Sequence, residues 1–479
     1  MRNFTGTLKA AFEYIDQELG HSSDLSFRQC QIGSDNTPAL IMWVDGLINK
    51  QSLNNDIISP LMSGSRSINR VDSDETTINF ISHSLITTTE VIQVTSYESL
   101  IPLLINGWSV VIIEGIDIMI AANTQGLETR SIDEPASTSV IRGPRDGFVE
   151  SIDTNISLIR RRVKNKLVRV ENHWIGNMSH TKIAMMYIFD RANPDTVSEV
   201  RTRLDHIDID AILESQYIED LIKDSPSSFF PTVYSTERPD DVAGAILEGR
   251  VAIIVDGTPF ALVLPCTLFH LLKTTEDLYL SYPIATFIRW IRFIGFFITL
   301  LLPASYLGVL TYHPEMVPPQ LLSSILSARD GVPFPLLMET LLMELTFEGL
   351  REASIRMPKS IGSAISIVGA LVIGESAVKA GIISSPSVII VAGTAIASFT
   401  IPSISLSATI RLLRFVMIIL ASFLGLYGIM IGLFLLGIHL SSIKSVGMPY
   451  LAPFAPFRPK EAERALVRVP WFTLRKRQK

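Results

Sequence analysis

The chain has 479 residues, with 41 lysines and arginines against 47 aspartates and glutamates, so its formal net charge is −6. Hydrophobic residues make up 47% and charged residues 18%, and the mean hydropathy of +0.34 is unusual for a soluble enzyme and indicates a membrane portion. The acidic balance argues against nucleic acid as the main partner, and two cysteines, Cys30 and Cys266, are too few for a disulfide framework.

Residues 1–280 alternate short apolar runs with polar helical stretches, a pattern that predicts an α/β fold. The start of the chain lacks the apolar core of a signal peptide, so we expect it to stay in the cytosol. Gly107 follows a predicted helix, and Gly249 does the same 142 positions later. An acid–glycine pair repeats at the same spacing, at Gly115 and Gly257. The repeat predicts two related α/β lobes, with an N-terminal extension 1–24, a first lobe 25–130, a linker and helix 131–165, and a second lobe 166–280.

The run VAIIVDGTPFALVLP at 251–265 predicts a β-hairpin with a two-residue turn. Its Asp256, and Asp45 after an earlier strand, could be ligands or catalytic acids, but an aspartate before glycine also serves simply to close a turn. The sequence has no glycine-rich nucleotide motif, no nucleophile elbow and no spaced His/Cys cluster. It therefore predicts no enzyme activity, no cofactor and no metal site.

A polar, proline-bearing linker at 132–163 passes into a helix that begins near Glu150 and ends in three consecutive arginines. The basic cluster Arg160–Arg162 could touch anionic lipid headgroups, or it could be the solvated end of a helix.

The second half of the chain contains long stretches without charge. They are 293–312, 380–410 and 415–443, and each is long enough for a bilayer core of about 30 Å. We expect an all-α, multi-span membrane domain at 281–445 and a basic cytosolic tail at 446–479. With both ends in the cytosol the number of spans must be even, and we expect four.

The segment 333–353 is apolar but carries several acidic residues. Glu344 and Glu348 fall on one helical face together with Arg351 and Glu352. Ionisable groups are costly at a bilayer centre, so this face must meet water, protein or headgroups. It could form an acidic vestibule that attracts cations, or an amphipathic helix at the membrane surface.

The segment 363–384 has two distinct helical faces. Val368, Val372 and Glu375 share the face opposite to a run of small residues. In a ring of identical helices, small residues allow close packing, a valine ring can gate by dewetting, and a glutamate ring favours cations. Ordinary bundle packing, with Glu375 and Lys379 as an ion pair, would explain the same pattern. The small face contains Ser366, Ala370, Gly374 and Ala377.

Several blocks of this chain are similar to the A subunits of GerA-type spore germinant receptors of endospore-forming bacteria. The resemblance is carried by HIDIDAILES at 206–215, TERPDDVAGAILEGRVAIIVDGTPFALVLP at 236–265, GVPFPLLMETLLMELTFEGLREASIRMPKSIG at 331–362, ISIVGALVIGESAVKAGIIS at 365–384 and PYLAPFAPFRP at 449–459. It is weakest in the first lobe.

The resemblance implies a location in the inner membrane of the dormant spore, with the N-terminal domain facing the core. It also implies three kinds of partner: a permease-like B subunit that binds nutrients, a lipoprotein C subunit, and further copies of this chain. These copies are expected to form a homo-oligomer, a pentamer, that acts as a nutrient-gated cation channel. Val368, Val372 and Glu375 then become the expected pore lining or gate, and Glu344 and Glu348 the expected entrance charges. The alternative is a membrane scaffold that relays the signal from the B subunit without conducting ions. A secondary transporter is less favoured, because the detectable repeat lies in the soluble half.

Overall fold

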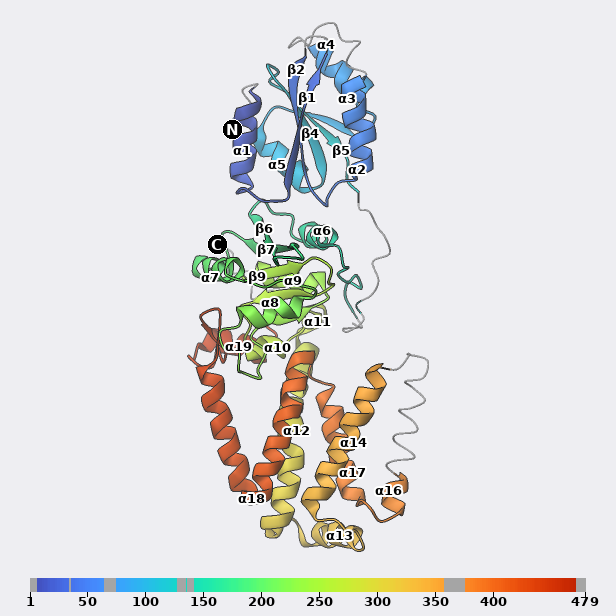
Figure 1. Cartoon of the computed structure of the whole chain (residues 1–479), viewed down its shortest axis with the longest axis vertical. Coiled ribbons are helices and arrows are strands. Elements are labelled where there is room, and N and C mark those ends of the chain that lie inside the picture. The colour runs from blue at the N-terminus through green and yellow to red at the C-terminus, as the bar shows by residue number, and fades with distance from the viewer. Residues whose placement is uncertain are drawn as a thin grey trace. The chain divides into compact units, whose positions relative to one another are not determined.

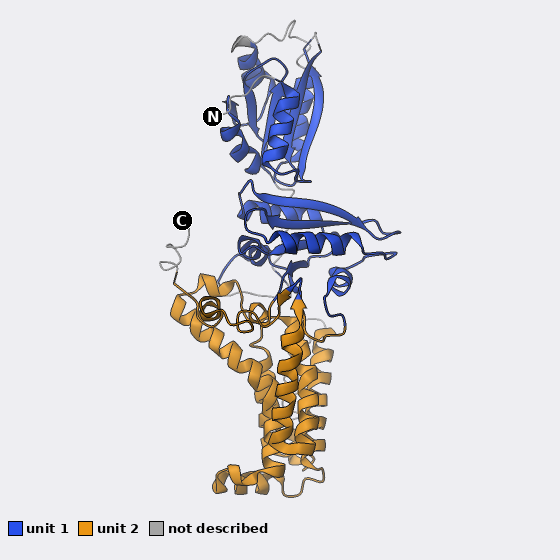
Figure 2. Cartoon of the chain, turned by 90° about the vertical axis from the view of Figure 1, so that its left-hand side faces the viewer, with its two compact units in different colours: residues 1–226, 233–266, 445–447 blue, residues 227–232, 267–444, 448–479 orange. Residues whose placement is uncertain are grey.

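The structure, a computed structural model, describes residues 7–33, 36–63, 75–126, 135, 142–356 and 375–470. The chain forms two compact units (Figure 2). The first, which we call the α/β unit, comprises residues 1–226, 233–266 and 445–447. The second, the helical unit, comprises residues 227–232, 267–444 and 448–479.

The first half of the α/β unit is an antiparallel five-stranded sheet with helices on both faces (Figure 1). Helices α1 and α5 pack on one face, and the helical segments between β2 and β3 pack on the other. The strand order is β1-β2-β4-β5-β3. The elements are α1 (Leu8–Glu18), β1 (Leu25–Ile32), β2 (Thr37–Val44), α2 (Lys50–Ser52), η1 (Leu53–Ile58), α3 (Ser59–Ser63), α4 (Glu75–Phe80), η3 (Ile81–Leu85), β3 (Val91–Val94), α5 (Tyr97–Ile105), β4 (Trp108–Ile113) and β5 (Met119–Asn123).

The second half of the α/β unit has a sheet with the equivalent strand order, β6-β7-β9-β10-β8. Helices α6 and α9 cover one face, and α7 and α8 cover the other. The elements are α6 (Ile152–Arg162), β6 (Val168–Ile175), β7 (Thr181–Ile188), α7 (Pro194–Asp205), α8 (Ser215–Ile222), β8 (Tyr234–Thr236), α9 (Pro239–Leu247), β9 (Val251–Val255) and β10 (Ala261–Leu264).

In the two acid–glycine pairs of the repeat, the acidic side chains make equivalent hydrogen bonds to helix N-termini. The Glu114 Oε2 atom accepts a hydrogen bond from the backbone N–H of Leu8 at the start of α1, at 2.9 Å. The Asp256 Oδ1 atom accepts one from Ile152 N at the start of α6, at 3.1 Å. Each carboxylate therefore satisfies a backbone donor that the first turn of a helix leaves open. The expected two-residue turn is wrong, because the strands around Asp256 stop pairing at Ile254 and Ala261.

The N-terminal extension expected at 1–24 contains the helix α1. Ala11, Ile15 and Leu19 of this helix are buried against the first sheet. The first lobe therefore begins before residue 25, because its sheet needs α1 to cover one face.

A buried ion pair joins the two halves of the α/β unit. Arg160 of α6 donates to both carboxylate oxygens of Asp24, at 2.8 and 2.9 Å, and to Ser22 Oγ at 2.9 Å. Next to it, Ser23 N donates to Val170 O of β6. Arg162 forms an ion pair with Asp146. Of the three arginines that could contact lipid, Arg160 is therefore buried inside the protein, and the half-buried Arg162 is paired with an acidic residue.

The first residues of the segment expected to be a basic cytosolic tail, 446–479, belong to the α/β unit. Val446 is 6% exposed and belongs to the core beneath the second sheet. Its N–H donates to Asp224 Oδ2 at 2.5 Å, and Ser445 Oγ accepts from Cys266 N at 2.9 Å. Burial raises the pKa of the Cys266 thiol to about 12, so this cysteine is a neutral core residue.

The helical unit contains two helices that are long and apolar enough to cross a bilayer among the residues described, α12 and α18. The shorter apolar helix α17 begins next to Pro386 and ends before Pro402. The elements are α10 (Leu268–Leu271), α11 (Glu276–Tyr279), α12 (Tyr282–Tyr312), η4 (Pro314–Met316), α13 (Pro319–Arg329), α14 (Leu336–Arg356), α16 (Ser376–Lys379), α17 (Ser385–Ser398), α18 (Ile404–Ser442), β11 (Lys444–Ser445), β12 (Met448–Pro449) and α19 (Pro459–Leu466).

Helix α18 is folded back on itself at Gly425 (Figure 1). This glycine has φ 62° and ψ −139°, a conformation open to glycine but not to other residues at low cost. Gly428 and Gly432 of the second half lie against Leu420 and Met417 of the first half. The charge-free window 415–443 is therefore a helical hairpin rather than a single straight span.

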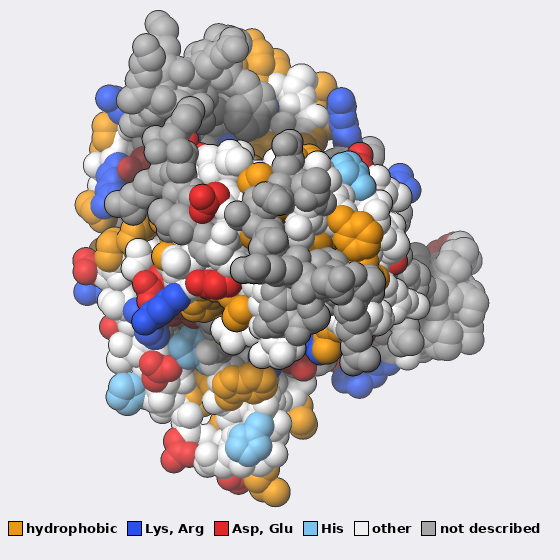
Figure 3. All heavy atoms as spheres, turned by 90° about the horizontal axis from the view of Figure 1, so that it is seen from above, with side chains coloured by type: hydrophobic (Ala, Val, Ile, Leu, Met, Phe, Trp, Pro, Cys, Tyr) orange, Lys and Arg blue, Asp and Glu red, His pale blue; other side chains and the backbone are white. Residues whose placement is uncertain are grey.

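Side chains of both charge signs are interspersed with apolar ones on the face seen in Figure 3. Charges mixed in this way largely screen one another at physiological salt.

Candidate functional site

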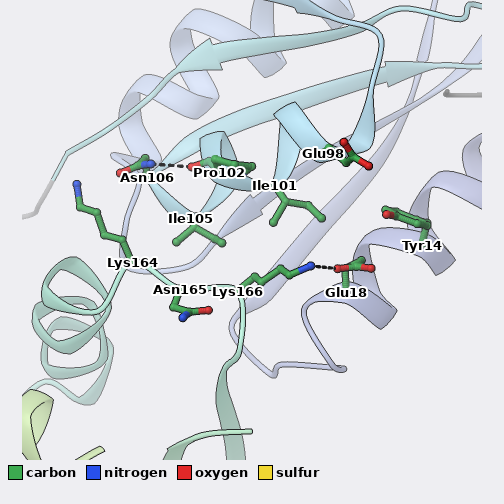
Figure 4. Close-up of a pocket in the computed structure, with 10 residues that line it drawn as sticks. All are labelled: Tyr14, Glu18, Glu98, Ile101, Pro102, Ile105, Asn106, Lys164, Asn165 and Lys166. Carbon is green, nitrogen blue, oxygen red and sulfur yellow. Dashed lines mark hydrogen bonds and ion pairs between the residues drawn. The ribbon is translucent and has the colours of Figure 1, made fainter. Parts of the chain in front are cut away.

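One pocket of the α/β unit lies where its two halves meet, with a volume of about 340 Å³ (Figure 4). Ile101 and Ile105 of α5 supply apolar surface, and Lys166 of the segment after α6 forms an ion pair with Glu18 of α1. Because acidic and basic groups line it together, the pocket suits a small molecule with both charges better than an ion of one sign. Its remaining lining residues are Tyr14, Glu98, Pro102, Asn106, Lys164 and Asn165.

A second polar cluster lies on the second sheet. Arg201 of α7 binds both carboxylate oxygens of Glu171 on β6, at 2.7 and 2.8 Å, and the Tyr187 hydroxyl donates to the same carboxylate at 2.6 Å. Burial alone would raise the pKa of Glu171, but the hydrogen bonds from Arg201 and Tyr187 outweigh it and lower the pKa below its ordinary value. Burial and the bond to Glu171 raise the pKa of Tyr187 to about 12. The cluster ties α7 to the sheet.

Replacing Glu171 by glutamine is expected to lower the free energy of local opening of β6 and α7 by no more than about 1 kcal/mol at pH 7. The effect is small because the Glu171–Arg201 ion pair is partly exposed and screened by solvent. A folded-state pKa below the unfolded one gives stability that is present at neutral pH and is lost as pH falls through the folded value. Hydrogen exchange should therefore be about fivefold faster in the variant at pH 7, and the difference from wild type should shrink as the pH falls through the folded-state pKa of Glu171. The exposed Glu248→Gln is the control and should show no difference over the same pH range.

The most unusual polar groups of the helical unit lie between α14 and α18. The side chains of Glu344 and Arg414 are fully buried, and Arg414 Nη2 lies 2.7 Å from Glu344 Oε2. Glu348 lies 3.7 Å from Arg411 Nε and 3.6 Å from Arg351 Nη1. These groups form a charged seam inside a largely apolar bundle.

A further buried carboxylate, Glu339, lies near the start of α14. Its Oε1 atom accepts hydrogen bonds from Ser384 N, at 2.7 Å, and from Ser384 Oγ, at 2.5 Å, at the N-terminus of α17. Its Oε2 atom lies 3.4 Å from Arg329 Nε. A carboxylate at this position complements the positive end of the helix dipole of α17.

The predicted gate segment is described only in part. Val368, Val372, Ser366, Ala370 and Gly374 lie outside the described residues. Of the remaining predicted site residues on this segment, Glu375 is exposed and lies 2.6 Å from Lys379 Nζ, and Ala377 is half-buried beside the cluster of Met343 and Ile383.

The predicted entrance charges are found next to arginines. Glu344 has no exposed surface and its charge is compensated by Arg414, whereas 37% of the Glu348 side chain is exposed. Their role at a pore entrance stays a prediction. The sequence alone assigns no role to Arg411 and Arg414, which pair with these glutamates. A signal was nevertheless present, since two arginines one turn apart in an apolar helix require acidic partners.

A profile of the family described as "Bacillus/Clostridium GerA spore germination protein" matches residues 13–479. The chain is 45% identical over 462 residues to spore germination protein KA of Bacillus subtilis (strain 168), covering 96% of this chain and 84% of that protein. It is 38% identical to spore germination protein GerLA of Bacillus cereus, covering 98% of this chain and 95% of that protein.

A solved structure is also similar: the N-terminal domain of the A subunit of the Bacillus megaterium spore germinant receptor GerK3. The identity is 35%, with 55% of this chain and 96% of that chain covered and a TM-score of 0.45. The matches to the family profile and to the full-length relatives extend through both units. The chain therefore belongs to the GerA family of spore germination proteins, as a member of the A-subunit type.

Proposed function

We propose that this protein is the A subunit of a nutrient germinant receptor in the inner membrane of the dormant spore. The helical unit crosses that membrane in several passes, and the α/β unit faces the spore core. The proposal is supported by the family, by the receptor named for the solved relative, and by the apolar helices α12 and α18. A permease-like B subunit and a lipoprotein C subunit complete the receptor, and the chain itself is not an enzyme.

In this proposal, copies of the chain assemble, as a pentamer, into a channel that releases cations when nutrient binds. The observation that carries it is the charged seam within the helical unit, because ionisable groups inside membrane bundles are costly and typically serve ion movement or gating. Val368, Val372 and Glu375 line the pore, and Glu348 with Glu344 stands at its entrance. The small face of Ser366, Ala370, Gly374 and Ala377 packs on the neighbouring copy.

We also infer that the two halves of the α/β unit arose by duplication. Their sheets have equivalent strand orders, and Glu114 and Asp256 cap the corresponding helices α1 and α6.

Val368→Ala and Val372→Ala test the channel, in cells that co-express the chain with its receptor partners. Each substitution removes apolar surface from the valine ring and so lowers the free-energy barrier that keeps the closed pore free of water. Potassium efflux without nutrient should therefore rise about tenfold, which corresponds to a barrier lower by about 1.4 kcal/mol. Val416→Ala, at an exposed site of α18, is the matched control and should stay tight.

If both variants accumulate in the membrane and remain as tight as wild type, the pore assignment is wrong and the scaffold becomes the better proposal.

A further inference from the structure

Two ion pairs connect α14 with α18, and we call them the inner and outer rungs. The inner rung is Glu344–Arg414, with 2.7 Å between Oε2 and Nη2. The outer rung is Glu348–Arg411, with 3.7 Å between Oε1 and Nε. The two glutamates are one helical turn apart, as are the two arginines, and they pair in opposite order. The helices therefore run antiparallel here and meet in one defined register.

The inner rung lies in surroundings that make a lone charge very costly. Both of its side chains are fully buried, and the most apolar window of α18 has a mean hydropathy of 2.4. A charge buried without a partner costs several kcal/mol, so Glu344 and Arg414 each require the other.

The contacts of α14 with its two neighbours differ in kind. Met343 forms a small apolar cluster with Ile383 and Val391, and Phe347 and Val388 pack against it, which attaches α14 to α17 and the loop before it. Toward α18, in contrast, α14 presents Glu344 and Glu348. Apolar packing is non-directional and tolerates small slides, whereas charge-assisted contacts in a low dielectric depend strongly on geometry. The two rungs therefore favour one register of α14 against α18, in addition to the packing of α14 on its other neighbours.

Stability alone does not explain the inner rung. An apolar pair of similar volume in place of a buried ion pair is often equally stable or more stable, so the rung points to a role in specifying register. The inner rung also joins two helices that lead to other parts of the chain. Helix α18 ends at Ser442, three residues before Ser445 in the α/β unit, and α14 leads into the segment predicted to carry the gate.

We propose that the two rungs make α14 follow the movement of the first half of α18, the part before Gly425, with Arg414 as the positioning residue that transmits it. The inference rests on the proposed function, because it concerns how nutrient binding reaches the gate. An axial shift of α18 then either carries α14 with it or breaks both ion pairs.

The test measures nutrient-triggered potassium efflux and membrane accumulation of the full receptor. The apolar double variant E344L/R414M removes both charges without leaving either unpaired, so it should accumulate normally but lose about tenfold in nutrient response. The exchanged pair E344R/R414E restores an ion pair and should recover the response to within about threefold of wild type. Glu352→Gln with Arg356→Gln removes an exposed ion pair of the same helix and should change nothing.

A normal response from E344L/R414M would overturn the proposal, because the rung would then be structural only. If that variant fails to accumulate in the membrane, the nutrient response of Glu348→Gln is measured instead, since this partly exposed site tolerates substitution. A response about threefold lower supports the outer rung, and an unchanged response rejects it.

The same cells separate this inference from the channel itself. If Val368→Ala releases potassium without nutrient but the rung variants respond to nutrient normally, the proposal about the rungs is rejected and the channel proposal is kept. If Val368→Ala does not leak, the channel fails, and the rungs are judged by a double-mutant cycle on the thermal stability of the purified complex. Additive effects of Glu344→Leu and Arg414→Met would then reject the coupling.

Discussion

Replacing Arg160 by methionine is expected to destabilise the α/β unit by about 3–5 kcal/mol. Arg160 is 2% exposed and Asp24 is 6% exposed, and the two meet through a bidentate contact of 2.8 and 2.9 Å. Methionine keeps much of the volume of arginine but leaves the Asp24 carboxylate buried without a cation. Ser22 and Val170, which are held beside this pair, should loosen with it.

Hydrogen exchange in the full chain is the suitable measurement, because a chain with two units has no single free energy of unfolding. Amides of α6 and β6 should lose more than about 100-fold in protection, the factor that corresponds to about 3 kcal/mol. Arg161→Met changes the same residue type on the same helix at a half-buried position, and its effect should stay below about threefold.

The double variant D24L/R160M separates the ion pair from simple packing. It removes both charges, so most of the protection should return. If Arg160→Met alone is as protected as wild type, the ion pair does not hold the two halves of the α/β unit together.

Local signals were sufficient for many elements. Pro239 and Gly249 bracket α9 because proline fits the first turn of a helix and a glycine with φ 89° can follow its end. The run 108–113 forms β4, and its buried side chains suit a strand at the centre of a sheet that is covered on both faces. These features depend on residues within a few positions of one another.

Contacts between distant residues could not be derived in this way. Arg160 and Asp24 are 136 positions apart, and nothing in either local pattern selects that partner. From the sequence we expect Glu344 and Glu348 to face water, protein or headgroups, in a vestibule or on a helix at the membrane surface. The structure instead places them next to Arg414 and Arg411, a pairing that the sequence analysis does not predict. Hydropathy also gave no sign of the bend at Gly425, because an apolar window has the same mean whether it is straight or folded.

Replacing Gly428 by alanine is expected to open the α18 hairpin and to destabilise the helical unit by at least about 3 kcal/mol, the upper end of overpacking costs. A Cβ atom at this position would lie 2.2 Å from the backbone oxygen of Leu420 and 2.7 Å from its carbonyl carbon. Backbone atoms cannot rotate away as a side chain can. The two halves of α18 would therefore have to separate along their packed face.

Gly437 provides a matched control on the same half of α18. A Cβ atom there meets nothing within 4 Å, and alanine favours a helix over glycine by about 1 kcal/mol, so Gly437→Ala should be neutral or slightly stabilising. The two substitutions are chemically identical, which makes the opposite signs informative. Thermal unfolding of the detergent-extracted protein and its level in the membrane are the measurements.

The same pair of variants tests whether the hairpin matters for the receptor. Gly425 also lies against Tyr312 at the end of α12, so opening the hairpin should disturb the contact between α12 and α18 as well. Gly428→Ala should therefore lower nutrient-triggered potassium efflux by more than about tenfold per molecule that reaches the membrane, while Gly437→Ala leaves it unchanged. Equal stability and equal efflux in the two variants would show that α18 is not folded back at Gly425, since only the hairpin brings Gly428 against Leu420.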